Sequence, residues 1–121
     1  MKGPLIMVVD DDPSVLRLLA ALLAARGYEV TTASDGGSAL EKLEAEAPRL
    51  VILDLLLPDM DGSEVLRRIR AVSRVPVLVL TAVGEAADRS RLLGLGADEY
   101  MTKPFDIMRL LGRVRELLGE G

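Results

Sequence analysis

The chain alternates between short, mostly apolar runs and longer segments in which apolar residues recur every three or four positions. The short runs occur five times, and they start 21 to 26 residues apart. Their ranges are Leu5–Val9, Glu29–Ala33, Leu50–Leu53, Pro76–Leu80 and Asp98–Met101. Their length and composition predict five β-strands.

The intervening segments carry apolar stripes with helical spacing, which predicts a helix after each strand. The first three stripes are Val15, Leu18, Leu19 and Leu22; Ala39, Leu40 and Leu43; and Val65, Leu66 and Ile69. Punctuation residues agree, because Asp12 before Pro13 is a good N-cap followed by proline at the first helical position. Gly27 suits the C′ position of the first helix, and Pro48 cannot continue the second. The strands and helices therefore form βαβ units.

The fourth helix is expected near Glu85–Gly94 and should be the least stable. It contains Gly94 and is followed by Gly96, and each glycine costs about 1 kcal/mol of helix propensity relative to alanine. The fifth helix follows a predicted cap at Asp106, and its stripe is Leu110, Leu111, Val114, Leu117 and Leu118.

The first, third and fourth strands are almost entirely apolar, as expected when helices cover both faces of a parallel sheet. The second strand, Glu29–Ala33, is more polar, which is typical of an edge. The prediction is an α/β fold with a doubly wound five-stranded parallel sheet. With 121 residues and half of them apolar, residues 1–121 are expected to form a single domain, with no second domain in this length.

Composition removes several classes of function. The formal net charge of −4 argues against direct nucleic-acid binding, which needs a basic surface. The chain has no Cys, and its longest apolar runs are far shorter than the roughly 20 residues of a membrane helix, so we expect no membrane insertion and a cytoplasmic location. His is also absent, so the chain cannot itself be a phosphohistidine donor.

Candidate chemistry lies at the carboxyl ends of the predicted strands, where open parallel sheets bind ligands. The residues found there are Asp10, Asp11 and Asp12 after the first strand, Asp54 after the third, Thr81 after the fourth and Lys103 after the fifth. Carboxylates about 4 Å apart repel by roughly 1 kcal/mol in water and about 4 kcal/mol at an effective dielectric of 20, so the cluster needs a cation. Carboxylate oxygens favour Mg²⁺ over Zn²⁺. With cations to neutralise the transferring oxygens, Asp54 could act as a nucleophile toward phosphorus.

Four motifs resemble the bacterial response regulator receiver signature, and the resemblance spans essentially the whole chain. They are Val8-Val9-Asp10-Asp11-Asp12, the run from Asp54 through Leu57-Pro58-Asp59-Met60-Asp61 to Gly62, Leu80-Thr81-Ala82 and Lys103-Pro104-Phe105. The resemblance implies a flavodoxin-like (βα)5 receiver domain, similar to chemotaxis regulators, with strand order 2-1-3-4-5. No output domain is expected in these residues.

The resemblance also implies a role for each site residue. Asp54 would accept the phosphoryl group, and Mg²⁺ would be held by Asp10, Asp11, Asp54 and the backbone carbonyl of Leu56. Thr81 would hydrogen-bond one phosphoryl oxygen and Lys103 would pair with another, with a cis Lys103–Pro104 bond. Tyr100 matches the aromatic residue that turns inward when the threonine moves. The signal would then leave through the fourth helix, the fifth strand and the fifth helix.

The implied partners are a sensor histidine kinase or phosphotransfer protein upstream and an unidentified protein or output domain downstream. A homodimer through the fourth helix, fifth strand and fifth helix is a further candidate. Many receivers fused to winged-helix DNA-binding domains carry acidic residues where this chain has Gly94 and Arg109, so the sequence argues against their type of dimer. The arginines of the third and fifth helices are expected to be solvated: Arg67, Arg68, Arg70, Arg109, Arg113 and Arg115.

Other interpretations remain open. The three N-terminal aspartates could simply cap the helix at Pro13, and the chain could be a pseudo-receiver that is never phosphorylated. A small-molecule phosphatase or phosphotransferase would commonly place a carboxylate two residues after its nucleophile, but that position is Leu56. We therefore expect a switch that catalyses only its own phosphorylation and dephosphorylation. Leu56 and Val83 should flank the path of an attacking water and slow the loss of phosphate.

Overall fold

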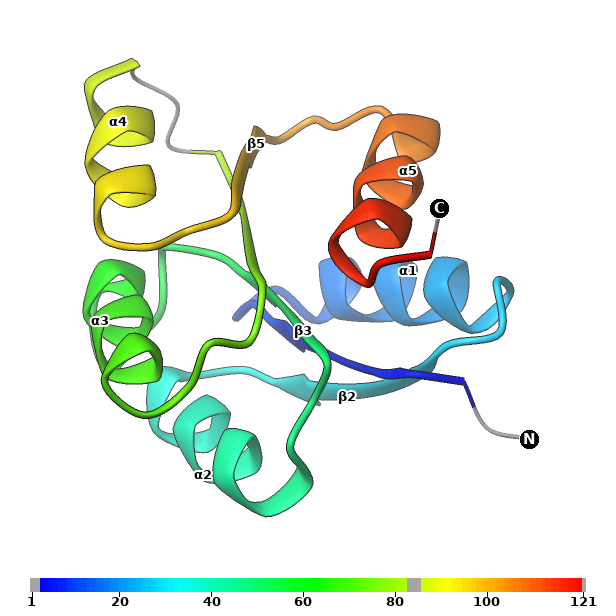
Figure 1. Ribbon diagram of the computed structural model, residues 1–121, viewed down its shortest axis with the longest axis horizontal. Helices are drawn as coiled ribbons and strands as arrows, with labels where there is room; N and C mark the ends of the chain where they lie inside the picture. The colour runs from blue at the N-terminus through cyan, green and yellow to red at the C-terminus, as the bar shows by residue number, and fades with distance from the viewer. Residues whose placement is uncertain (1–2, 83–85, 121) are drawn as a thin grey trace.

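The computed structural model describes residues 3–82 and 86–120, and it forms five strands alternating with five helices in this part of the chain (Figure 1). The strands are β1 Leu5–Val9, β2 Glu29–Ala33, β3 Leu50–Leu53, β4 Val77–Thr81 and β5 Glu99–Thr102. The helices are α1 Pro13–Ala24, α2 Gly36–Glu46, α3 Gly62–Val72, α4 Ala86–Gly94 and α5 Ile107–Leu117. The predicted α/β alternation is confirmed.

All neighbouring strands pair in parallel, in the order β2-β1-β3-β4-β5, which confirms the doubly wound sheet. β3 and β4 are buried throughout, whereas four of the five residues of the edge strand β2 are only partly buried. Figure 1 shows α1 and α5 on one face of the sheet and α2, α3 and α4 on the other. Successive strand residues alternate between these faces: Met7 and Val9 pack with α2 and α3, and Ile6 and Val8 pack with α1 and α5.

The predicted helix caps form. The Asp12 carboxylate accepts a hydrogen bond of 2.8 Å from the amide of Ser14, and Asp106 accepts one of 2.9 Å from the amide of Arg109. The first helix ends earlier than a C′ position at Gly27 would imply. Its C-cap residue is Ala25, whose backbone dihedral angles lie in the right-handed helical region. Gly27 instead adopts φ 91° in the turn that follows.

The fourth and fifth strands each begin and end one residue later than predicted. Pro76 precedes β4, since it has no amide hydrogen to donate and only its carbonyl joins the sheet, accepting from Val51 at 3.0 Å. At the other end, Thr81 pairs with Thr102, so Thr81 is the last residue of β4 rather than the first residue after it. This shift buries Thr81 completely.

The fourth helix ends at Gly94, as predicted. Glu85 lies outside the described residues, and Gly96 is not a helical residue. Gly96 has φ 109°, and a Cβ there would lie 2.9 Å from Nε of Arg70. Arg70 is therefore not solvated as expected, because its guanidinium donates to the carbonyls of Gly96 and Val75 and pairs with Asp98 at 2.8 Å. The low stability of α4 stays a prediction.

Among residues 3–82 and 86–120, none of the helices has the length and apolar character that spanning a membrane would require.

Candidate functional site

The carboxyl ends of β1, β3, β4 and β5 are joined by backbone hydrogen bonds that bring the site residues together. The amide of Asp54 donates to the carbonyl of Val9 at 2.9 Å, which places Asp54 beside Asp10. The amide of Lys103 donates to the carbonyl of Thr81 at 2.9 Å. Because these bonds continue the parallel ladders, the sheet register itself sets the relative positions of the side chains.

Three carboxylates gather at this edge. Oxygens of Asp10, Asp11 and Asp54 lie within 4.8 Å of one another. Asp10 and Asp54 are only 3% and 5% exposed, whereas Asp11 is exposed. The structure therefore brings together the three acids that the sequence singled out as metal ligands. Asp12 lies next to these acids in the sequence, and its carboxylate caps α1, as the sequence predicted.

Lys103 lies between the two buried acids. Its Nζ is 2.6 Å from Oδ2 of Asp10 and 3.1 Å from Oδ2 of Asp54. Burial alone would lower the pKa of Lys103, but the hydrogen bonds to Asp10 and Asp54 outweigh it and raise the pKa above its ordinary value. The Lys103–Pro104 peptide bond is cis, as the resemblance implies.

The cluster retains an excess of negative charge. Burial is the main effect that raises the pKa of Asp10, and the nearby Asp54 raises it further. The hydrogen bonds from Lys103 and from the Asp12 amide, which lies at 2.9 Å, act in the opposite direction but do not cancel the increase. Three carboxylates and one ammonium leave two formal negative charges, and all the available donor atoms are oxygens. This donor set fits a hard divalent cation such as Mg²⁺.

The loop after β3 returns to the site along a fixed path. The amide of Leu56 donates to Oδ1 of Asp54 at 3.3 Å, and Leu56 forms an antiparallel bridge with Asp61. The amide of Gly62 donates to the carbonyl of Leu55 at 2.9 Å. These contacts hold the Leu56 backbone close to Asp54, while the Leu56 side chain is 57% exposed.

The two predicted switch residues are both buried. Thr81 is fully buried at the end of β4. Tyr100 is 3% exposed on β5, which is more buried than expected for a tyrosine on an edge strand, and it belongs to the same core cluster as Leu92 of α4. Burial, followed by the negative charge of Asp88, raises the pKa of Tyr100. Tyr100 therefore connects β5 to the core beneath α4.

The sequence profile of the response regulator receiver domain matches residues 6–115. The chain belongs to this family. The receiver domain is 47% identical over 113 residues to a probable transcriptional regulator, ycf27, of Cyanophora paradoxa, covering 93% of this chain and 47% of that protein. It is also 47% identical over 114 residues to the alkaline phosphatase synthesis transcriptional regulatory protein PhoP of Bacillus subtilis, covering 93% and 48%. The chain thus spans about half the length of these curated relatives.

Solved structures agree with this assignment. The BeF3-activated N-terminal receiver domain of RstA from Klebsiella pneumoniae superimposes with a TM-score of 0.91 at 34% identity, covering 94% of this chain and 97% of that one. A putative response regulator from Chloroflexus aurantiacus gives a TM-score of 0.91 at 35% identity, covering 98% and 99%. The fold and the family are those of the receiver domains of two-component response regulators.

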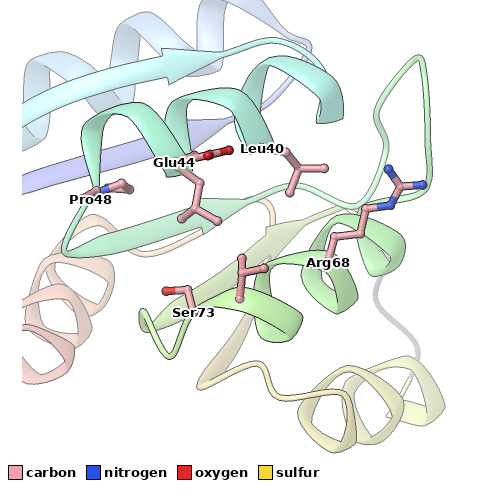
Figure 2. Close-up of a pocket in the computed structure, with 8 residues that line it drawn as sticks. Leu40, Glu44, Pro48, Arg68 and Ser73 are labelled. Carbon is pink, nitrogen blue, oxygen red and sulfur yellow. The ribbon is translucent and has the colours of Figure 1, made fainter.

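A cavity of about 570 Å³ lies on another part of the receiver domain, between α2 and α3 (Figure 2). Its wall includes Leu40 and Glu44 from α2 and Arg68 from α3. None of the predicted site residues lines it. The predicted site residues thus gather at the strand ends and not at this cavity.

Two contacts that support the site were not predicted from the sequence. Asp59 binds the first turn of α2, with its carboxylate 2.8 Å from the amide of Gly36 and 2.9 Å from that of Gly37. Gly62 packs directly on the backbone that follows β3, because a Cβ there would lie 2.6 Å from the carbonyl oxygen of Asp54. The only sequence signal for either is their position in the Pro58–Gly62 turn.

Proposed function

We propose that this receiver domain is a phosphoacceptor switch that takes a phosphoryl group from a phosphohistidine on a histidine kinase or phosphotransfer protein. The observation that supports this most strongly is the position of Asp54. Its buried carboxylate lies within 4.8 Å of two other acids and 3.1 Å from the Lys103 ammonium. That arrangement gives a nucleophile together with the positive charge that phosphoryl transfer needs.

In the proposed transfer, an Asp54 oxygen forms a bond to phosphorus while the bond from phosphorus to the donor nitrogen breaks. The donor nitrogen keeps the electron pair of the broken bond, and because the other ring nitrogen of the phosphohistidine carries a proton, a neutral histidine leaves. Lys103 would pair with one phosphoryl oxygen, and the Thr81 hydroxyl would donate to another. Mg²⁺, held by Asp10, Asp11, Asp54 and the Leu56 carbonyl, would supply positive charge to the phosphoryl oxygens.

We infer that the domain is not a conventional enzyme and catalyses only its own phosphorylation and dephosphorylation. A phosphatase of the aspartyl-phosphate type would need a general acid close to its nucleophile, and the residue two positions after Asp54 is the apolar Leu56. The pseudo-receiver alternative is less favourable, because it gives no reason to bury two carboxylates around one lysine at a desolvation cost.

The output surface is proposed to be the face formed by α4, β5 and α5. Glu99 of β5 already connects these elements, since it pairs with Arg113 of α5 at 2.7 Å and with Arg89 of α4 at 3.7 Å. A change at Thr81 and Tyr100 would alter the packing beneath α4 and so the surface offered to a downstream protein, an output domain or a second copy of the chain. Arg113, expected to be solvated, is therefore engaged within the chain.

The phosphoacceptor proposal is tested by incubation with a small acyl-phosphate donor, with and without Mg²⁺, followed by mass spectrometry of the intact protein. We expect the parent to gain one phosphoryl group only with Mg²⁺ and Asp54→Asn to gain none. Asp12→Asn is the matched control, because Asp12 is next to the cluster but caps α1, and asparagine also caps well. Labelling of Asp54→Asn equal to that of the parent would contradict the proposal.

Phosphate loss is predicted to be slow because an exposed apolar side chain stands beside the acceptor. Leu56→Asn should shorten the lifetime of the phosphorylated state several-fold, since an amide can hydrogen-bond an attacking water. The measurement is the decay of the phosphorylated mass with time. Leu56→Met, which stays apolar, should decay at the parental rate. Val83, the second expected flanking residue, lies outside the described residues. A Leu56→Asn lifetime equal to that of the parent would rule out shielding by Leu56.

A further inference from the structure

The loop between β3 and α3, residues 54–61, is attached at its tip to the start of α2. One carboxylate makes the attachment: Oδ1 of Asp59 accepts from the amide of Gly36 at 2.8 Å, and Oδ2 accepts from the amide of Gly37 at 2.9 Å. The partners are 22 and 23 residues away along the sequence. The contact is therefore tertiary and joins the loop to another element of the fold.

Beside these two hydrogen bonds of Asp59, called the clamp below, an apolar side chain also connects the loop tip to α2. A Cβ on Gly36 would lie 2.6 Å from Cγ and 2.8 Å from Sδ of Met60, so Met60 lies directly on the helix backbone. Met60 is partly buried against the core cluster. The loop tip thus docks on α2 through a carboxylate and a neighbouring hydrophobic side chain.

Asp59 accepts hydrogen bonds from two amides of α2 to which the N-cap residue of that helix does not bind. The N-cap of α2 is Asp35, which accepts from the amide of Ser38 at 2.7 Å. The two preceding amides would otherwise be left to solvent, and Asp59 satisfies both of them. Although Asp59 is exposed, the hydrogen bonds from Gly36 and Gly37 lower its pKa below the ordinary value, so the group is an anion at the positive end of the helix dipole.

The segment between this clamp and the proposed metal site is short and has little conformational freedom. Only Leu57 and Pro58 lie between Leu56 and Asp59. The ring fixes φ of Pro58, and it also restricts the backbone of the residue before it. At its base, the loop is held by the bridge from Leu56 to Asp61. Fixing Asp59 therefore restricts the directions that the Leu56 carbonyl can take.

We propose that Asp59 is a positioning residue: by clamping the loop tip to the first turn of α2, it holds the Leu56 carbonyl in place for Mg²⁺. The inference rests on the proposed function, because it assumes that Mg²⁺ binds beside Asp54. It assigns Asp59 a role in metal affinity, although its carboxylate is not among the proposed ligands.

The test compares Mg²⁺ affinity, measured by titration calorimetry on the unphosphorylated protein, in the parent, Asp59→Ala and Asp35→Ala. The last is the matched control, because it removes a carboxylate cap from the same helix without touching the loop. We expect Asp59→Ala to weaken Mg²⁺ binding about 10-fold, as loss of a group supporting a metal ligand typically does. Asp35→Ala should bind Mg²⁺ with parental affinity, and hydrogen exchange at the Leu56 amide should speed up only in Asp59→Ala.

Equal Mg²⁺ affinity in Asp59→Ala and the parent would overturn the inference, even if both cap variants unfold at lower temperature, because Asp59 would then act on the helix alone. The same result would leave the phosphoacceptor proposal intact. A parent that takes up no Mg²⁺ at all would overturn both. Asp59→Asn refines the result, since its single oxygen should retain part of the affinity.

Discussion

Replacing Lys103 with methionine is expected to destabilise the Mg²⁺-free receiver domain by about 3 kcal/mol, the typical cost of leaving a buried ion-pair partner without its counter-charge. The Lys103 side chain is 20% exposed and contacts two carboxylates that are nearly inaccessible to water. Methionine preserves most of the length of the side chain but removes the charge. Urea denaturation followed by circular dichroism measures the change.

Saturating Mg²⁺ should recover most of this loss, because a ligand at one hundred times its dissociation constant stabilises the folded state by about 2.7 kcal/mol. The rate of phosphorylation, in contrast, should not recover when Mg²⁺ is added. Lys103→Met is expected to label about 100-fold more slowly than the parent, since a cation directed at the transferring oxygens is lost. An unchanged labelling rate would show that Lys103 neutralises the free site without assisting the transfer.

The deficit of Lys103→Met should depend on pH in a defined direction. The pKa of Asp10 is raised above its ordinary value of 3.8, so protonation of Asp10 favours the folded state, and the stability it contributes is lost as pH rises through the folded-state pKa. Without Lys103 this pKa should rise further. The deficit should therefore be smallest near pH 4 and grow toward neutrality. Adding Asp10→Asn to Lys103→Met should restore part of the stability at neutral pH.

Ionisation of Lys103 itself should make the stability of the parent depend on pH in the alkaline range. Its folded-state pKa is raised above 10.5, so its stabilising contribution is complete below that value and is lost as pH rises through the raised pKa. The parent should therefore lose stability in this alkaline range, and Lys103→Met should lack that particular loss.

Gly62→Ala is expected to cost about 3 kcal/mol of stability and to slow phosphorylation roughly 100-fold. An added Cβ would lie 2.5 Å from Cα of Leu55 and 2.6 Å from the carbonyl oxygen of Asp54. Both contacts are to backbone atoms, which cannot rotate away as a side chain could. The backbone beside the acceptor must move, and a displacement of about 1 Å is enough to slow a positioned reaction strongly.

Gly112→Ala provides the control with the opposite sign. Gly112 lies within α5, and an added Cβ there would meet no atom within 4 Å. Alanine should therefore stabilise the domain by up to about 1 kcal/mol through helix propensity. If Gly62→Ala unfolds at the same urea concentration as the parent, the approach of Gly62 to the backbone of Asp54 and Leu55 is not tight enough to position Asp54.

Local sequence signals predicted most of the fold correctly because they act within a few residues. The first three strands have the predicted bounds, and Asp12 and Asp106 cap helices as expected. Strand ends were less predictable, since pairing with a neighbouring strand decides them, as the Thr81–Thr102 pair shows. From the sequence, Gly96 was expected to weaken the fourth helix, but it lies after that helix. Its positive φ and its close contact with Arg70 explain why glycine is present there.

The sequence alone determined that this protein is a parallel α/β domain with four aspartates directly after two of its strands, because the hydrophobic period and the residues at strand ends are readable along the chain. Only the tertiary structure decided how closely these acids approach one another and which of them are buried. It buries Asp10 and Asp54 around an ammonium group 93 and 49 residues away. It also brings the Asp59 carboxylate to the first turn of α2. These outcomes depend on distances between remote segments, which sheet register and loop packing fix and which no local pattern contains.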